Sequence, residues 1–479
     1  MLADLKKALS RKEYLYALIA LACGTAMAVI NPPFAGVPDE QAHYWKAWAV
    51  AMGNLRCRRE NAIPLSAYNL PRNGFPPTAS VPGVGERIVF HETIERMFEP
   101  DAAGLTTEGR TICNATPIGY LPQALGLRLG SLLRLNALSS FYLARMANLT
   151  ASVAIVFWAI RVIPFGKILL LVIGLLPMTI QQFSSLTYDP LHISLSFLFL
   201  AHVLRLSNTP QPPGARELAT LAAIGLLAVN VKLGYAGLAL LVFLIPAGKF
   251  GSRKRYWLWS AGFLAANAVV SAAVYQFFVR DSASIGTGAG IPGVKIAGQV
   301  SHVIGSPRNF FMVFVNTVYG NMNFYLESFL FKPGWLIQSL PPLWYLFVIA
   351  GMVVLVRNED EKVDLTGRQR HLLLLVFLVN VLVVFFSLYI GWTRVGEGIV
   401  QGVQGRYLLG VFPLLLLFFY KDERALVHEF VRKRLHVLLV CFYLTVFAGA
   451  FLAIYRIYYD KNPQAPLTEK IGEKLFGAP

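Results

Sequence analysis

Residues 371–390 read HLLLLVFLVNVLVVFFSLYI, a stretch without a single Asp, Glu, Lys or Arg. About 20 apolar residues are enough for a helix to cross the hydrocarbon core of a bilayer. The whole chain shares this character, because 56% of its 479 residues are hydrophobic and only 14% are charged. A typical soluble domain carries about 25% charged residues. The sequence therefore predicts an all-α polytopic integral membrane protein.

Ten further apolar segments approach the length of a membrane span, so we expect about eleven transmembrane helices within residues 1–456. The first segment lacks a small-residue cleavage site and is expected to stay as a helix rather than to be a removed signal. The segments are residues 13–31, 139–160, 168–184, 190–204, 217–231, 234–248, 257–279, 338–356, 371–390, 407–420 and 435–456.

The net charge of +17 is expected to reflect membrane topology rather than binding to nucleic acid. Basic residues gather in alternate short loops, and such loops face the cytoplasm in polytopic proteins. This bias places the N-terminus inside and the C-terminal tail, residues 457–479, outside. We expect a multi-pass protein of the cytoplasmic membrane.

Two long segments interrupt the alternation, and both are expected outside. Residues 32–138 contain two helix-like pieces, 39–53 and 117–134, which are predicted to lie at the interface. Residues 280–337 contain an apolar piece, 309–331, that is not counted as a span because it would reverse the charge bias of every later loop. Cys57 and Cys113 both fall in the first loop, where an oxidising exterior favours a disulfide over two free thiols.

The stretch that follows the first predicted span concentrates ionisable groups. Pro38 opens a helix, and Asp39, Glu40 and His43 share one face of it at spacings of three and four residues. Acids at a helix start are often only capping charges. Two carboxylates and an imidazole at the mouth of a membrane cavity nevertheless favour a functional site, because ionisable groups are costly there.

These residues also carry a resemblance. Pro38-Asp39-Glu40-x-x-His43 after the first span resembles a family of bacterial polytopic membrane proteins known only as a domain of unknown function. Through that family the chain resembles the GT-C superfamily of lipid-dependent glycosyltransferases. The resemblance covers about residues 10–420 and rests on four further motifs in order, residues 116–126, 176–189, 230–235 and 404–409, although Thr116 stands where the family has an aromatic residue.

The resemblance implies transfer of a sugar from a polyprenyl-phosphate donor to an extracytoplasmic glycan, lipid or protein, with inversion and with the first-loop acid as base. We assign Asp39 as general base, with Glu40 second and His43 beside them. Lys232 and Arg406 are expected to bind the lipid phosphate, since the topology places them on the same side. Further candidates for substrate contact on that side are Arg394, Asp189, Tyr188 and Arg145.

Each assignment has an ordinary alternative. Lys232 could snorkel from the end of a span, Arg406 could anchor an interface, and Asp189 could cap a helix. No metal or other cofactor is expected to be required, although Asp39, Glu40, His43 and Asp189 would suit a divalent cation. Rival functions are a transporter or flippase of lipid-linked glycan precursors, a lipid-linked glycan polymerase or ligase, and a non-catalytic assembly subunit.

Overall fold

The computed structural model describes residues 11–56, 61–73, 90–108, 115–279, 292–357, 365–420 and 434–460. These residues are mostly helical, and strands β1 and β2 form one short antiparallel ribbon in the first loop. The longer helices are α2 (Lys12–Ile30), α3 (Glu40–Ala51), α6 (Leu121–Leu132), α7 (Ala137–Val162), α10 (Asp189–Asn208), α11 (Ala215–Asn230), α12 (Arg253–Val274), α14 (Pro307–Gly320), α17 (Pro342–Val356), α18 (Gly367–Trp392) and α21 (Leu435–Tyr458).

Shorter elements connect these helices. They are β1 (Ile63–Pro64), α4 (Leu65–Asn73), α5 (Phe90–Arg96), β2 (Leu105–Thr106), η2 (Pro117–Tyr120), α8 (Lys167–Gly174), α9 (Pro177–Phe183), η3 (Leu233–Leu244), η4 (Ala247–Phe250), η5 (Tyr275–Val279), α13 (Ile296–Gly305), α15 (Met322–Leu330), α16 (Pro333–Leu336), η7 (Gly405–Leu408) and α19 (Phe412–Phe419).

Among the described residues, six helices are long and apolar enough to cross a membrane, which confirms the prediction of an all-α membrane protein. They comprise α2, α7, α10, α12 with its extension to Phe278, α18 and α21. Helices η3 and α17 are apolar but shorter. Each of the eleven predicted segments contains helix, but α19 has only 8 residues. A count of eleven spans therefore stays a prediction.

Side chains supply hydrogen-bond acceptors at the starts of α7 and α18. Asn136 accepts from the backbone N–H of Ser139 at the start of α7 (2.9 Å). At the start of α18, Thr366 accepts from the N–H of Gln369, whose own side chain accepts from the N–H of Thr366 (3.3 and 2.9 Å). These caps and a capping box satisfy N–H groups that have no partner within the helix.

The predicted span 168–184 is broken in the middle. Helix α8 ends at Gly174, and α9 starts at Pro177, whose ring cannot continue the helix. The hydroxyl of Thr179 donates to the carbonyl oxygen of Ile173 (2.7 Å), so this acceptor has a hydrogen-bond partner at the break. The break leaves α9 as a short helix that carries the polar residues Thr179, Gln181 and Gln182 between apolar segments.

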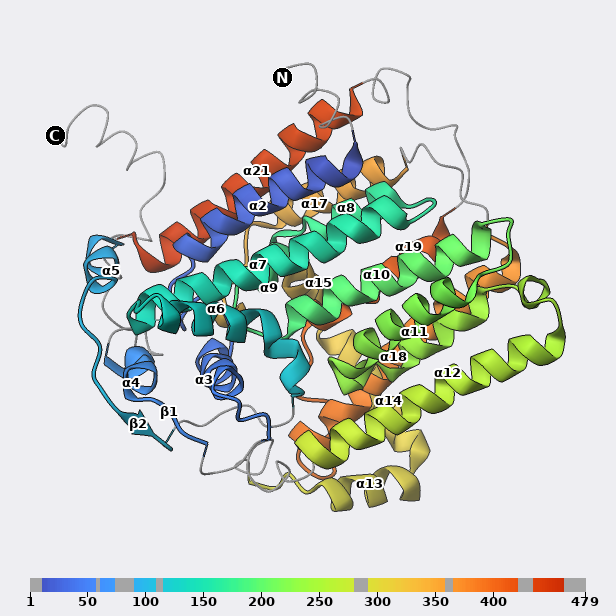
Figure 1. Ribbon diagram of the computed structural model, residues 1–479, viewed down its shortest axis with the longest axis horizontal. Helices are drawn as coiled ribbons and strands as arrows, with labels where there is room; N and C mark the ends of the chain where they lie inside the picture. Colours follow the sequence, from blue (N-terminus) through green and yellow to red (C-terminus); the bar gives the residue numbers. More distant parts are fainter. Residues whose placement is uncertain are drawn as a thin grey trace.

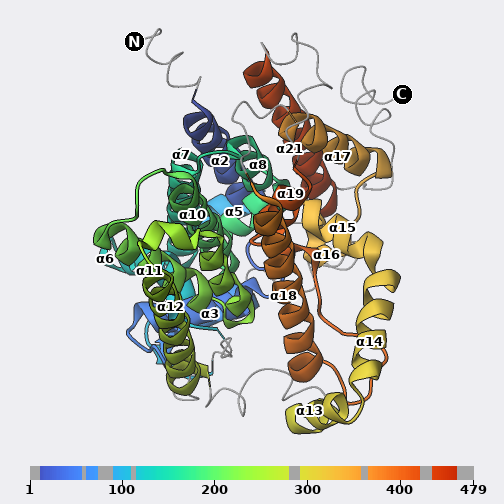
Figure 2. The same cartoon turned by 90° about the vertical axis from the view of Figure 1, so that its right-hand side faces the viewer.

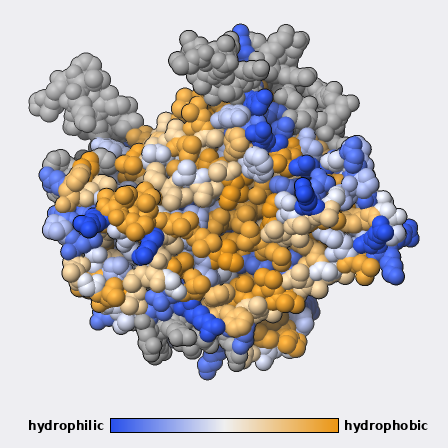
Figure 3. Space-filling model, viewed as in Figure 1, coloured by the Kyte–Doolittle hydropathy of each residue, from blue (hydrophilic) through white to orange (hydrophobic). Residues whose placement is uncertain are grey.

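Helix α7 holds the first half of the chain together, since it packs against α2, α6 and α10 (Figure 1). Viewed from the side, helices α2 to α12 lie on one side and α13, α14 and α18 on the other (Figure 2). On the face shown in Figure 3, apolar side chains cover the middle and hydrophilic residues gather at the margins. An apolar belt of this kind suits a surface in contact with lipid.

The predicted interfacial pieces of the first loop form helices close to their expected bounds, α3 for 39–53 and η2 with α6 for 117–134. The apolar piece 309–331 forms α14 and α15, which meet at Asn321. Cys57 and Cys113 lie outside the described residues, and so do residues 461–479, which make up most of the predicted tail.

Candidate functional site

The chain leaves α2 through a compact turn that isolates one carboxylate. Residues 31–38 and Glu40 are buried, whereas Asp39 between them is exposed. Asp39 adopts a left-handed backbone conformation (φ 60°, ψ 10°), which Asp and Asn tolerate better than other residues with a side chain. This kink sends Asp39 and Glu40 in different directions. The two carboxylates predicted to share one face therefore occupy separate environments.

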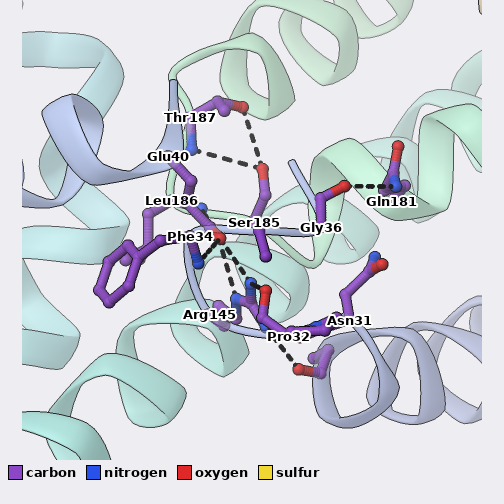
Figure 4. A network of polar contacts seen from close by, with 12 residues as sticks. Asn31, Pro32, Phe34, Gly36, Glu40, Arg145, Gln181, Ser185, Leu186 and Thr187 are labelled. Atoms are coloured by element: carbon purple, nitrogen blue, oxygen red, sulfur yellow. Dashed lines mark hydrogen bonds and ion pairs between the residues drawn. The ribbon is translucent and has the colours of Figure 1, made fainter. Parts of the chain in front are cut away.

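Glu40 forms a fully buried pair with Arg145 of α7. The side chains are both 0% exposed, with 2.5 Å between Arg145 Nη2 and Glu40 Oε2 and 3.0 Å between Nε and Oε1. The backbone N–H groups of Phe34 and Leu186 also donate to the Glu40 carboxylate (3.3 and 3.2 Å; Figure 4). Arg145 donates in turn to the carbonyls of Ala28 and Asn31 (2.7 Å each).

This network fastens the end of α2, the start of α3, α7 and the turn before α10 to one another. The Glu40 carboxylate accepts four hydrogen bonds, so it has no exposed oxygen for a substrate proton. Arg145 is equally enclosed and cannot meet a lipid phosphate without dismantling the network. In this structure both side chains hold segments of the fold together. The catalytic role predicted for Glu40 and the ligand-binding role predicted for Arg145 stay predictions.

His43 lies one turn into α3 and faces two tyrosines. Its Nδ1 is 2.6 Å from the hydroxyl of Tyr120, and its ring centroid is 5.3 Å from that of Tyr188. Burial lowers the pKa of His43 to about 3; Asp189 opposes this shift, while Arg406 and Lys232 add to it. His43 is therefore neutral at physiological pH. It supports the aromatic wall beside Asp39 and is not a source of positive charge.

The second acid–base pair joins Asp189, at the start of α10, to Lys232, before η3. Lys232 Nζ is 2.6 Å from Asp189 Oδ1, and the two side chains are 16% and 9% exposed. Three rings surround the ammonium, with centroids at 4.9 Å for Tyr188, 5.5 Å for Tyr235 and 4.4 Å for Tyr407. Burial acts to lower the pKa of Lys232, but Asp189 and the tyrosines outweigh it and raise that pKa. The ammonium therefore stays charged.

Arg406 completes the group from η7. Its guanidinium donates to the side-chain oxygens of Gln404 (2.6 Å) and Gln182 (3.1 Å), so the polar helix α9 contributes directly to the site. Among the described residues Arg406 takes part in no ion pair with a carboxylate. Burial acts to lower its pKa, whereas Tyr407, Asp189 and Asp39 raise it. Arg406 is thus a buried cation within the electrostatic reach of both acids.

Gly405 explains how the chain reaches this position. A Cβ at Gly405 would come within 1.9 Å of the carbonyl oxygen of Tyr325 in α15, which leaves no space for a side chain. The backbone N–H of Gly405 instead donates to the hydroxyl of Ser328 (2.8 Å). Close backbone contact with α15 therefore fixes the position of Arg406.

The structure brings together residues from five separate stretches of the chain. Burial raises the pKa values of Tyr120 and Tyr188, and the charges of Asp189 and Asp39 add to that effect. Asp39 also acts on Arg406. One exposed carboxylate, the buried guanidinium of Arg406, the largely buried ammonium of Lys232 and an aromatic wall consequently share one site. The sequence-predicted members that meet here are Asp39, His43, Tyr188, Asp189, Lys232 and Arg406.

Arg394 lies elsewhere. It is exposed just beyond the end of α18, where its side chain passes Gly293 in the second long loop. None of the contacts found in the described residues joins it to the site. Within the same residues, no three His, Cys, Asp or Glu side chains gather closely enough to hold a metal ion. Glu40 and Asp189, two of the candidate ligands, are paired with Arg145 and Lys232 instead.

Sequence reasoning missed several residues of the site. Tyr120, Tyr235 and Tyr407 fall inside the motifs given above, but nothing in the sequence showed that Tyr120 would contact His43 or that Tyr235 and Tyr407 would flank Lys232. Gln182 did carry a signal, because Gln181 and Gln182 interrupt an apolar segment. Buried polar groups in such a segment need partners, and Arg406 is the partner of Gln182.

Comparison with known proteins gives one match. The model of a family described as predicted membrane protein (DUF2142) matches residues 21–416, most of the chain, and the protein therefore belongs to this family. This confirms the resemblance to a family known only as a domain of unknown function; kinship with the GT-C superfamily stays a prediction. No curated protein and no solved structure matches the chain.

Proposed function

We propose that this protein is a membrane glycosyltransferase, which moves a sugar from a polyprenyl-phosphate donor to an extracytoplasmic glycan, lipid or protein acceptor. The observation that carries the proposal is the placement of Asp39. It is the exposed acid of a site whose other charged members, Asp189, Lys232 and Arg406, are buried or nearly so. This reaction requires a base that the acceptor can reach and cations that can bind the phosphate of the donor.

The reaction assigns one role to each group. Asp39 takes the proton of an acceptor hydroxyl, whose oxygen forms the new bond to the anomeric carbon. The bond between that carbon and the phosphate oxygen breaks on the opposite face, so the configuration inverts. Lys232 and Arg406 stabilise the charge that develops on the departing polyprenyl phosphate. Arg406 would contact phosphate oxygens through its planar guanidinium, and Lys232 would act as a compact charge.

Three further observations support a lipid donor. Six apolar helices put the site in a bilayer protein. Lys232 and Arg406 lie at the ends of apolar segments, as Asp189 does at the start of α10. Aromatic rings around Lys232 exclude water, which strengthens contacts between cations and phosphate. The corresponding location is the extracytoplasmic side of the bacterial cytoplasmic membrane.

A flippase of lipid-linked precursors is the second candidate, and the broken helix α8–α9 favours it. Transporters often carry such interruptions at their substrate sites, with polar groups exposed by the break. Cations would then hold the lipid phosphate during its passage, and Asp39 would perform no chemistry.

One assay separates the two candidates. The purified protein in liposomes would receive a panel of radiolabelled polyprenyl-phosphate sugars and a mixed extract of envelope glycans and lipids. We expect label to leave the donor and appear in the acceptor fraction. Movement of intact donor across the bilayer without transfer would favour the flippase. Glu217→Gln, in an exposed pair with Arg205, is the matched control for carboxylate-to-amide substitutions and should behave as wild type.

A further inference from the structure

His192 is a buried histidine that nothing in the site uses. It lies on α10, one turn after Asp189, and is 2% exposed. Neither of its ring nitrogens has a hydrogen-bond partner in the part of the chain that the structure describes. A neutral imidazole always carries one N–H donor, and a buried donor without an acceptor costs free energy. Such a group calls for an explanation.

Two segments that carry the cations hold the His192 ring in place. Its centroid is 3.7 Å from that of Tyr235, three residues after Lys232. On another side runs the chain that follows Arg406, where a Cβ at Gly410 would come within 2.8 Å of His192 Nε2. His192 therefore fills the space behind both cations, and neither segment offers it an acceptor.

Asp189 is a carboxylate within the electrostatic reach of His192, and it could serve the ring as an acceptor. Residues three apart on a helix are neighbours on its surface, so a change of side-chain rotamer moves the Asp189 carboxylate toward the imidazole. In the structure that carboxylate is instead bound to Lys232, its one hydrogen-bond partner among the described residues. Lys232 is the group that the proposed function assigns to the donor phosphate. Asp189 and the phosphate thus compete for one ammonium.

We propose that Asp189 exchanges partners when the donor binds, leaving Lys232 for His192. This inference rests on the proposed function, since the donor's phosphate drives the exchange. The phosphate takes the place of the carboxylate at Lys232, and the neutral imidazole donates its N–H to the released carboxylate; no proton is transferred. His192 is a positioning residue, because it acts on the donor through Asp189 and Lys232. Without it, the released carboxylate would stay partly buried and unpaired.

Binding of a polyprenyl phosphate without sugar, measured in detergent, tests the exchange independently of catalysis. The matched polyprenol, which lacks the phosphate, is the ligand control. His192→Phe keeps an aromatic ring against Tyr235 but removes the N–H donor. We expect it to weaken binding about 10-fold or more, the scale of a lost hydrogen bond to a charged group. His192→Gln retains an N–H donor and should recover part of that loss.

A double substitution distinguishes the exchange from a merely structural role. Asp189→Asn frees Lys232 in advance, so this variant should bind the lipid phosphate at least as tightly as wild type. In that background His192→Phe should change affinity by less than about twofold, because the two residues are coupled only through the carboxylate. His202→Phe is the control on the same helix, since the His202 ring already bonds to the carbonyl of Leu198 (3.0 Å).

The stability of His192→Phe provides the second readout. Removing an unpaired buried polar ring should leave the melting temperature unchanged or raise it, while binding falls. Wild-type affinity in His192→Phe, equal losses in both backgrounds, or a wild type that does not bind the lipid phosphate would each overturn the exchange. Binding with the expected coupling but no sugar transfer would refute the proposed function and leave the exchange standing.

Discussion

Two acid–base pairs lie close together in this protein and differ in almost every physical respect. Glu40 and Arg145 are 0% exposed and joined by two hydrogen bonds, with backbone groups occupying the rest of their capacity. Asp189 and Lys232 are joined by one contact, remain 9% and 16% exposed, and have rings for neighbours. The first pair is complete without a ligand, whereas the second is not.

Complete hydrogen bonding separates a structural ion pair from one that can bind a ligand. A buried pair compensates for its lost hydration only when hydrogen bonds satisfy both partners fully. The Glu40 pair meets that condition and connects four segments of the fold. The Asp189 pair leaves bonding capacity on both partners next to an uncompensated guanidinium, that of Arg406. An incoming phosphate can add to the second pair but would have to dismantle the first.

The largest effect on stability should come from breaking the complete pair. Arg145→Met leaves the Glu40 carboxylate buried without its partner, which costs about 3–5 kcal/mol in comparable sites. Thermal unfolding in detergent measures this loss. Arg161→Met on the same helix is the control, because Arg161 is exposed. A melting temperature of Arg145→Met equal to that of the control would mean that the pair does not hold the fold together.

Breaking the incomplete pair should affect binding more than folding. Lys232→Met and Arg406→Met each remove a charge-assisted contact to the lipid phosphate, so binding of polyprenyl phosphate should weaken about 10-fold or more. Both variants should melt closer to wild type than Arg145→Met does. Arg205→Met, which removes a surface pair of 3.6 Å, should change neither property. The opposite pattern, with unfolding but unchanged affinity, would reverse the roles given to the two pairs.

Lys46 of α3 gives a smaller effect that varies with pH. Its side chain is 0% exposed, its Nζ has no hydrogen-bond partner among the described residues, and burial lowers its pKa to about 8. Lys46→Met should raise the stability of the protein by about 1–3 kcal/mol near neutral pH, because it removes an uncompensated buried ammonium.

The sign of the pH dependence follows from that lowered pKa. Between pH 8 and the ordinary lysine pKa of about 10.5, the unfolded chain holds a proton that the folded chain has lost. The stability of wild type should therefore rise with pH across this range, and Lys46→Met should lack that rise. Melting temperatures measured at intervals from pH 7 to about pH 10.5 check it. Parallel curves for the two proteins would show that Lys46 is not buried as a charged group.

The apolar segments and the loop charges predicted the membrane class and the helical segments. They did not predict most of the side-chain contacts at the site. The membrane class and the positions of the helical segments followed from stretches such as residues 371–390, since burial in lipid demands them. The break at Pro177 and the shortness of α19 were not predicted. Local hydrophobicity does not show where tertiary contacts stabilise a helix that is interrupted. Asp39 and Glu40 show the same limit at the site. Adjacent residues looked equivalent in sequence, and one left-handed backbone conformation separated them.

The substitution Asp39→Asn tests whether Asp39 is the general base of sugar transfer. Asn is isosteric with Asp and tolerates the same left-handed conformation, so the variant should fold and should bind polyprenyl phosphate within about twofold of wild type. It cannot accept the acceptor's proton. We predict that transfer of sugar from a saturating polyprenyl-phosphate donor, followed over a single turnover, falls by about 10²–10⁴-fold. Transfer by a folded Asp39→Asn protein at the wild-type rate would show that Asp39 is not the general base.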